Sequence, residues 1–343
     1  MTGPLDEGIS GDSMRAVIDI GTNSVKLLVA RIASQRVTPI EEANEQTRLG
    51  NGLYRSQLLL PEAIESTSAA VDRMVRRANE HGAQCIRIIA TSAVREARNA
   101  PLLIQAIFAS TGLLVEIISG DTEARLVFQG VRSQANLGPG PMLVLDAGGG
   151  STEFILGHGE NCLFRQSFPL GVVRMLEGFP HQDPPGLAAR TTCLSETTQF
   201  LERTVRPVIE PFLLRTPPLF LVGTGGSAAI LARIESQLVK FDRVQIEATR
   251  LSRARLGDHV SRLWGSTLSD RRAIPGIPPE RADIIIMGAI IYEAVMKHFV
   301  LDELRVSTRG LRFAALLETA PCGSSESVDI PVGDAAPLRA DRS

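Results

Sequence analysis

The stretch 17–32, VIDIGTNSVKLLVARI, decides the fold of this chain, because it returns in similar form at 144–159 as VLDAGGGSTEFILGHG. In both stretches an apolar run contains an aspartate near its end, Asp19 or Asp146, a turn of small residues follows, and a second apolar run leads away. Apolar runs joined by Gly, Ser, Thr and Asn are typical of β-hairpins. Repetition of such a unit indicates that the chain has two similar halves.

Each hairpin opens a series of alternating strands and helices. After the first hairpin, residues 37–50 predict a third strand, and apolar residues at helical spacing predict a helix over 61–81. Strand and helix patterns alternate up to residue 135, and a Gly/Pro break at 139–141 precedes the second hairpin. This order predicts an α/β protein, in which mixed sheets carry helices on their faces.

Composition argues against several classes of protein. The 343 residues are enough for about two domains. Aromatic residues make up only 4%, too few for a surface that stacks single-stranded nucleic acid, so we expect no nucleic-acid partner. With a net charge of -2, the chain has no global positive field, and an anionic ligand must be held by local cations and backbone amides.

The cysteines and the apolar segments bear on location. Cys85, Cys162, Cys193 and Cys322 are far apart and form neither a CxxC pair nor a zinc-binding pattern, which predicts a reducing compartment and no zinc. The N-terminus lacks a basic-then-apolar signal, and the apolar stretch 282–296 is too short and too interrupted to span a bilayer. We therefore expect a cytoplasmic protein with no membrane contact.

The two hairpin turns are the predicted phosphate-binding sites. Exposed N–H groups and hydroxyls after a strand form a concave nest for phosphate oxygens, and Asp19 and Asp146 are suited to hold Mg²⁺, or Mn²⁺ as an alternative, against those oxygens. A single Asp-Gly turn is more often an ordinary hairpin that binds no ligand. Because the turn occurs twice, we hypothesise that two nests bind one phosphate chain. The predicted phosphate-binding residues are Gly21, Thr22, Asn23, Ser24, Gly148, Gly149, Gly150, Ser151 and Thr152.

A third glycine loop lies between the strand LFLV and a predicted helix, and comprises Gly223, Thr224, Gly225, Gly226 and Ser227. Amides at such a connection point at an anion or leave room for a flat nucleobase and ribose. The alternative is a tight strand-to-helix connection that binds no ligand.

Together these segments resemble the exopolyphosphatase and guanosine pentaphosphate phosphohydrolase (Ppx/GppA) family, of the sugar-kinase, heat-shock ATPase and actin superfamily. The resemblance is carried by VIDIGTNSVKLLVARI, ATSAVREARN, ISGDTEARLVFQGV, VLDAGGGSTEFILG and LVGTGGSAAILA. It implies two actin-like (ribonuclease H-like) domains, each a mixed five-stranded sheet flanked by helices, with a cleft between them. It also implies the short, two-domain form of the family and a homodimer.

The resemblance assigns roles to three further residues. Glu123, before the Ala of SGDTEAR, corresponds to the catalytic carboxylate that activates water, Arg95 to a phosphate-binding arginine, and Glu153 to a carboxylate associated with the metal or the water. By residue type alone, Glu123 reads as a solvated first-turn residue of a helix, and Arg95 as a surface partner of an acidic neighbour. Phe313 departs from the pattern, since many relatives carry Glu there.

These expectations define domains and functions. We predict a disordered tail at 1–13, an actin-like domain I at 14–137 with the last helix near 309–320 as a candidate addition, domain II at 138–308, and a disordered tail at 321–343. The predicted activity is the Mg²⁺-dependent release of terminal orthophosphate from inorganic polyphosphate. The nearest alternative is hydrolysis of guanosine pentaphosphate to tetraphosphate. More distant alternatives are a phosphotransferase to ADP or a sugar, and a non-catalytic sensor of guanosine tetraphosphate or polyphosphate.

Overall fold

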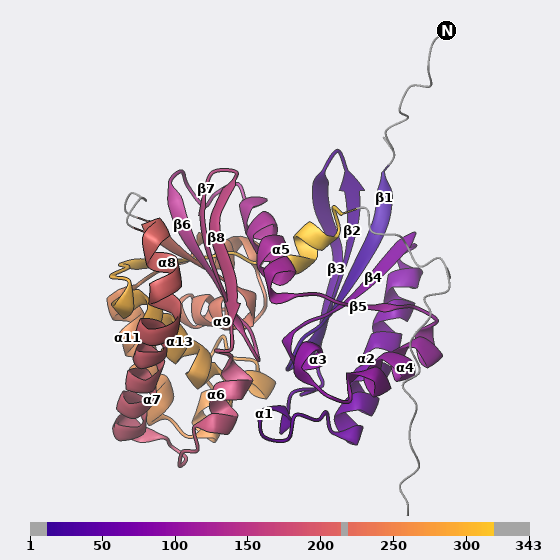
Figure 1. Cartoon of the computed structure of the whole chain (residues 1–343). Helices are drawn as coiled ribbons and strands as arrows, with labels where there is room; N and C mark the ends of the chain where they lie inside the picture. The colour runs from indigo at the N-terminus through magenta and orange to yellow at the C-terminus, as the bar shows by residue number, and fades with distance from the viewer. Residues whose placement is uncertain (1–11, 214–218, 319–343) are drawn as a thin grey trace, which may run out of the picture.

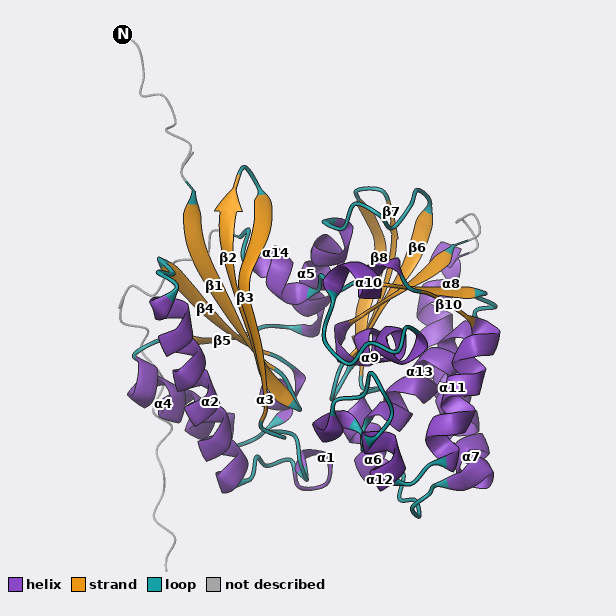
Figure 2. Cartoon of the chain, turned by 180° about the vertical axis from the view of Figure 1, so that it is seen from behind, coloured by secondary structure: helices purple, strands orange, loops and turns teal. Residues whose placement is uncertain are grey.

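Two β-sheets stand side by side in the computed structural model, which describes residues 12–213 and 219–318 (Figures 1 and 2). The predicted C-terminal tail and most of the N-terminal one lie outside the described residues. Ser13, placed in the N-terminal tail by the sequence, begins the first strand. The predicted domain boundaries stay a prediction.

The first sheet has five strands in the order β3-β2-β1-β4-β5. Its central strand β1 pairs antiparallel with β2 and parallel with β4. A strand covered on both faces is expected to be nearly all apolar, as β1 is over Ala16–Ile20 apart from Asp19. The strands are β1 (Ser13–Ile20), β2 (Ser24–Ala33), β3 (Arg36–Gln46), β4 (Cys85–Ala90) and β5 (Val115–Ile117).

The second sheet repeats this plan, with the order β10-β11-β9-β6-β7-β8. Its strands are β6 (Pro141–Ala147), β7 (Thr152–His158), β8 (Asn161–Phe168), β9 (Phe220–Thr224), β10 (Arg250–Ser252) and β11 (Glu303–Val306). The predicted fold class of two mixed, helix-flanked sheets is confirmed. The second sheet nevertheless has six strands where five were expected, because β10 adds an edge strand of 3 residues, too short to show an alternating pattern.

Helices cover both sheets. In the first half they are α1 (Leu53–Ser56), α2 (Pro61–Glu80), α3 (Ser92–Glu96), α4 (Ala100–Thr111) and α5 (Gly120–Arg132). In the second half they are α6 (Val172–Gly178), α7 (Gly186–Phe200), the π-helix η1 (Leu201–Val205), α8 (Arg206–Leu213), α9 (Gly225–Glu235), α10 (Arg243–Ala248), α11 (Arg253–Gly265), α12 (Leu268–Arg272), the 3₁₀-helix η2 (Pro279–Arg281), α13 (Ile285–His298) and α14 (Leu311–Ala315).

Two of these helices, α5 and α14, lie between the two sheets (Figure 2). Their apolar side chains, including Val127 and Phe313, join Val17 of the first sheet and Val144 of the second in one buried cluster. Phe313 is 1% exposed, and the guanidinium of Arg243 lies 5.0 Å from the centre of its ring. The position that departs from the family pattern therefore has a packing role here. Separate cores lie under α2 and α4 and around α13.

The structure also bears on the cysteines and on membrane contact. Cys162 and Cys193 carry free thiols, whereas Cys85 is disulfide-bonded, and the reducing compartment stays a prediction. Within residues 12–213 and 219–318, every helix is too short or too polar to cross a membrane.

Candidate active site

The two hairpin turns have the same construction. In the first, the amide of Gly21 donates to the carbonyl oxygen of Ser24 at 3.0 Å, and in the second the amide of Gly148 donates to that of Ser151 at 2.9 Å. Asp19 pairs with Lys26 across the first hairpin, and Asp146 pairs with Glu153 across the second. The repeat seen in the sequence is therefore a repeat in backbone geometry.

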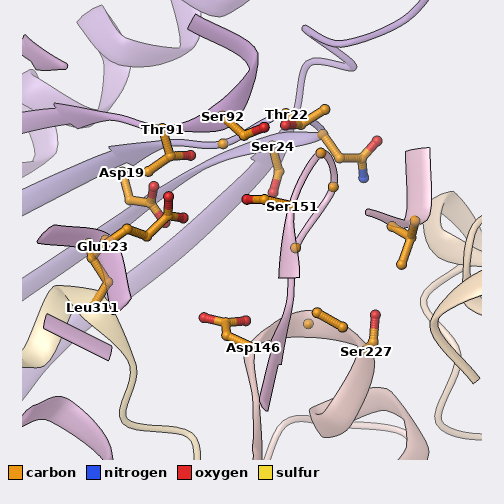
Figure 3. Close-up of a pocket in the computed structure, with 18 of the residues that line it drawn as sticks. Asp19, Thr22, Ser24, Thr91, Ser92, Glu123, Asp146, Ser151, Ser227 and Leu311 are labelled. Carbon is orange, nitrogen blue, oxygen red and sulfur yellow. The ribbon is translucent and has the colours of Figure 1, made fainter. Parts of the chain in front are cut away.

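Both turns line one small cavity between the two sheets, with a volume of about 80 Å³ (Figure 3). Carboxylates enter it from the ends of β1 and β6, from α5 and from β7. The lining residues are Asp19, Gly21, Thr22, Asn23, Ser24, Lys26, Thr91, Ser92, Glu123, Asp146, Ala147, Gly148, Gly149, Gly150, Ser151, Glu153, Val172, Gly226, Ser227, Arg281 and Leu311. The facing arrangement of the two turns, on which the hypothesis depends, is present.

The turns approach each other so closely that glycine is required. A Cβ atom on Gly149 would lie 2.6 Å from the Cβ of Thr22, across the gap between the halves. A Cβ on Gly150 would lie 2.0 Å from the hydroxyl of Tyr54 and 2.3 Å from that of Ser92. The glycines of the second turn thus let its backbone amides reach the first half of the chain.

Five predicted site residues are absent from the wall of this cavity: Arg95, Thr152, Gly223, Thr224 and Gly225. Thr152 is fully buried, and its hydroxyl donates to the carbonyl oxygen of Leu170. Gly223 is packed against Tyr292 and Leu304 in the core. Arg95 lies behind Glu123, where its Nη1 donates to the Glu123 carboxylate at 2.7 Å and to the carbonyl oxygen of Ile118 at 3.0 Å.

Glu123 is held at the start of α5. The hydroxyl of Ser119 caps this helix by accepting from the amide of Thr122 at 3.1 Å, and the Arg95 ion pair fixes the Glu123 carboxylate. The side chain of Glu123 is 13% exposed. It is therefore a partly buried, paired residue and not a fully solvated one.

Burial raises the pKa of three carboxyl groups of the cavity wall, those of Glu123, Asp146 and Glu153. The pKa of Glu123 rises to about 7, because desolvation and the nearby Asp19 outweigh the effect of Arg95. Burial likewise raises the pKa of Asp146 to about 6 and that of Glu153 well above its usual range, with Glu123 adding to the latter shift. Carboxyl groups perturbed in this way are typical of catalytic sites.

The donor set fits a divalent cation that is only partly held by protein. Four carboxylates line the cavity against the cations of Lys26 and Arg281, so the wall carries an acidic excess. In the described residues, no three His, Cys, Asp or Glu side chains are grouped closely enough to form a complete metal site. Mg²⁺ commonly uses one or two carboxylates and takes its other ligands from water and substrate phosphates, which suits Asp19 and Asp146.

Sequence reasoning missed four polar residues of the cavity wall: Lys26, Thr91, Ser92 and Arg281. Lys26 was recognisable, because it occupies the position of Glu153 in the sequence repeat. Thr91 and Ser92 follow β4, at the same sheet edge as the first turn. Arg281, in η2, donates from Nη2 to the Ser24 hydroxyl at 2.8 Å, and no local pattern indicates a contact across so much of the chain.

A second cavity of about 860 Å³ adjoins the first, and the two share six lining residues: Asp19, Lys26, Asp146, Gly226, Arg281 and Leu311. Thr224, Gly225 and Gly226 of the third glycine loop line it, together with apolar residues of α9 and of the segment 272–281. Gly225 has φ +78, and a Cβ there would lie 2.2 Å from Oδ1 of Asp146. This glycine therefore leaves room for the Asp146 carboxylate where the two cavities meet.

The family comparison agrees with this geometry. Residues 28–321 match the model of the Ppx/GppA phosphatase family. Exopolyphosphatase 2 of Mycobacterium tuberculosis is 33% identical over 313 residues, which covers 85% of this chain and 94% of that protein. A guanosine-5'-triphosphate,3'-diphosphate pyrophosphatase of Vibrio parahaemolyticus is 29% identical and covers 88% of this chain and 58% of its own length.

Solved structures show the same fold. An exopolyphosphatase of Cytophaga hutchinsonii superposes with a TM-score of 0.81 at 28% identity, covering 91% of this chain and 100% of the other. The Aquifex aeolicus member of the Ppx/GppA family superposes with a TM-score of 0.74 at 27% identity, covering 90% and 97%.

Proposed function

Because this chain belongs to the Ppx/GppA phosphatase family, we propose that it is an exopolyphosphatase that uses water to release terminal orthophosphate from inorganic polyphosphate. The observation that carries the proposal is the single small cavity that receives both glycine turns and four carboxylates. The amides and hydroxyls of the turns are suited to bind phosphoryl oxygens from two sides. A terminal phosphoryl group bound there lies beside Glu123.

Glu123 is the proposed general base. In the proposed step the water oxygen bonds to the terminal phosphorus, the bond to the bridging oxygen breaks with its electrons staying on that oxygen, and Glu123 takes the proton of the water. A carboxylate with a pKa of about 7 is matched to this task near neutral pH. Arg95 orients Glu123 through their ion pair, so we assign it a positioning role.

Mg²⁺, with Mn²⁺ as an alternative, is the proposed cofactor, with Asp19 and Asp146 as its candidate protein ligands and Glu153 as a carboxylate associated with the metal or with the attacking water. When bound, the metal would neutralise charge on the phosphoryl oxygens. The buried acidic excess of the cavity wall supports this assignment, because the carboxylates need a cation to ionise together.

The second cavity supports guanosine pentaphosphate as a second candidate substrate. A polyphosphate chain has no apolar part, whereas Ile230, Phe241 and Ile277 give this cavity an apolar wall. Ligand pockets for nucleosides combine such walls with a few polar groups, here the glycine loop at the start of α9. The 5'-phosphates of the nucleotide would then extend into the small cavity.

One experiment separates the two substrates. Orthophosphate release is measured from tripolyphosphate, long-chain polyphosphate and guanosine pentaphosphate, each with and without Mg²⁺. We expect metal-dependent release from polyphosphate. Release from the nucleotide alone would replace the first assignment by the second.

Two further measurements test the more distant functions. ATP formed from polyphosphate and ADP would indicate a phosphotransferase. Binding of polyphosphate with no release of orthophosphate would indicate a sensor. A homodimer in the cytoplasm completes the proposal, and the oligomeric state can be measured by light scattering.

A further inference from the structure

Arg174, in α6, joins the second hairpin turn to the first half of the chain. Its Nε donates to the carbonyl oxygen of Gly150 at 2.8 Å, and its Nη2 donates to the two carboxylate oxygens of Glu96, in α3, at 2.7 and 2.6 Å. The guanidinium also lies 3.9 Å from the centre of the Tyr54 ring, in α1. A side chain of the second half is therefore held by two residues of the first half.

The start of α6 binds the carbonyl oxygens of the second turn one after another. The amide of Val172 donates to the carbonyl oxygen of Gly148 at 3.0 Å. The amide of Val173 donates to that of Gly149 at 2.8 Å. The guanidinium described above supplies the donor for the next carbonyl group, that of Gly150. Three consecutive carbonyl groups of the turn therefore point to α6.

The N–H groups of the same three peptide units face the other way. A planar trans peptide carries its C=O and its N–H on opposite sides, so the amides of Gly149, Gly150 and Ser151 point away from α6. All three residues line the small cavity, and their amides donate to no acceptor within the described part of the chain. These amides remain available to phosphoryl oxygens. The direction of the Ser151 amide depends on the bond from the side chain of Arg174.

We propose that Arg174 is a positioning residue, which directs the Ser151 amide toward a bound phosphoryl group. It does so only while Glu96 and Tyr54 of the first half hold its guanidinium. This inference rests on the proposed phosphoanhydride hydrolysis. Arg174 is absent from the walls of both cavities, so it acts through the peptide that it binds and not on the substrate. The second turn then reaches its binding geometry only when the two halves are in contact.

Binding and kinetics of Arg174→Met test the proposal. A turn that binds phosphoryl oxygens equally in the ground state and in the transition state affects KM more than kcat. We expect Arg174→Met to raise KM for tripolyphosphate about tenfold and to leave kcat within about threefold of wild type. Calorimetry with the non-hydrolysable methylenediphosphonate and Mg²⁺ should show binding weakened by a similar factor. Arg174→Lys should be almost as impaired, because one ammonium group lacks the planar fork that contacts Gly150 and Glu96 together.

Arg55→Gln is the matched control. Arg55, in α1, also crosses between the halves, where its guanidinium donates to the carbonyl oxygen of Glu177 in α6, outside both cavities. Its KM and its binding of the analogue should equal those of the wild type. If Arg55→Gln weakened binding as much as Arg174→Met does, any loosening between the halves would have this effect, and the proposal would be overturned.

A double-mutant cycle tests the dependence on the first half. Glu96→Gln keeps an acceptor for the Ser92 hydroxyl but removes the charge that holds Arg174. We expect it to weaken analogue binding about threefold in the wild type and not at all in Arg174→Met, because the two residues act as a unit. Arg174→Lys replaces Arg174→Met in the cycle if the latter does not fold.

Two results of these binding measurements would overturn the proposal. One is an additive effect of Glu96→Gln on Arg174→Met, and the other is analogue binding by Arg174→Met within about twofold of wild type. A wild-type protein that binds the analogue but releases no orthophosphate would instead contradict the proposed function. The binding comparison would then still decide the role of Arg174.

Discussion

The carboxylate of Glu123 combines three properties that a general base needs: it lines the small cavity, it forms an ion pair with Arg95, and burial raises its pKa. We expect Glu123→Gln to lower kcat by about 10²- to 10⁴-fold, because the amide cannot accept the proton of the attacking water. Binding of methylenediphosphonate should be retained. Asp121→Asn, in the same helical turn but exposed and paired with Arg165, is the matched control. Near-normal turnover of Glu123→Gln would remove this residue from the mechanism.

The same residue predicts the dependence of activity on pH. A base must be deprotonated, and the pKa of Glu123 is raised to about 7, so its active fraction rises as pH rises through that value. We expect kcat/KM to increase with pH between about 5.5 and 8 and to fall about tenfold per pH unit on the acid side. A bound divalent cation favours the ionised carboxylate, so saturation with Mg²⁺ should move the inflection to lower pH. A flat profile of kcat/KM over this range would exclude Glu123 as the titrating base.

Among the elements, α5 connects the cavity to the packing between the two sheets. Its first turn carries Glu123, and further along the helix Gly130 faces the chain that leads into α14. A Cβ on Gly130 would lie 2.1 Å from the carbonyl oxygen of Gly310. Gly130→Ala should therefore push the two elements apart and reduce the free energy of unfolding by about 1–3 kcal/mol, measured by urea denaturation. Gln129→Ala, exposed on the same helix, should change it by less than about 0.5 kcal/mol. If Gly130→Ala were as stable as the wild type, the two elements would be able to move apart at no cost in free energy, and the close contact would not be required.

The elements also show where sequence reasoning succeeds and where it ends. The hairpins were predictable, because turn chemistry and apolar alternation are local, and the helix α2 ends within a residue of its predicted range. The contact between Arg281 and Ser24 was not predictable, because it depends on how η2 packs against the first half of the chain. The phosphate-binding role of Arg95 stays a prediction. Its contacts with Glu123 and with the carbonyl oxygen of Ile118 depend on how α3 packs against the segment after β5, which no spacing in the sequence encodes.

At the scale of the whole molecule, ion pairs join the two halves of the chain. Arg48, after β3, forms an ion pair at 2.7 Å with Asp283, just before α13. An exposed pair of this kind contributes little, so we expect Arg48→Gln to lower kcat/KM by at most about fivefold. The difference from wild type should shrink at high salt, because screening weakens the pair in the wild type as well. Arg76→Gln removes an ion pair within α2 and should have no effect on kcat/KM. A loss from Arg48→Gln that persists in high salt would exclude this electrostatic explanation.

The roughly 80 Å³ chamber behind the two turns bears on which molecules can be degraded at all. Two turns that face one cavity are suited to hold a terminal phosphoryl group from both sides, and a closed ring has no such group to offer. Cyclic trimetaphosphate, which has the same bonds as tripolyphosphate but no terminus, should therefore resist the protein, while linear chains shorten one unit at a time. The rate of orthophosphate release should therefore depend on the concentration of chain ends and not on the length of the chains.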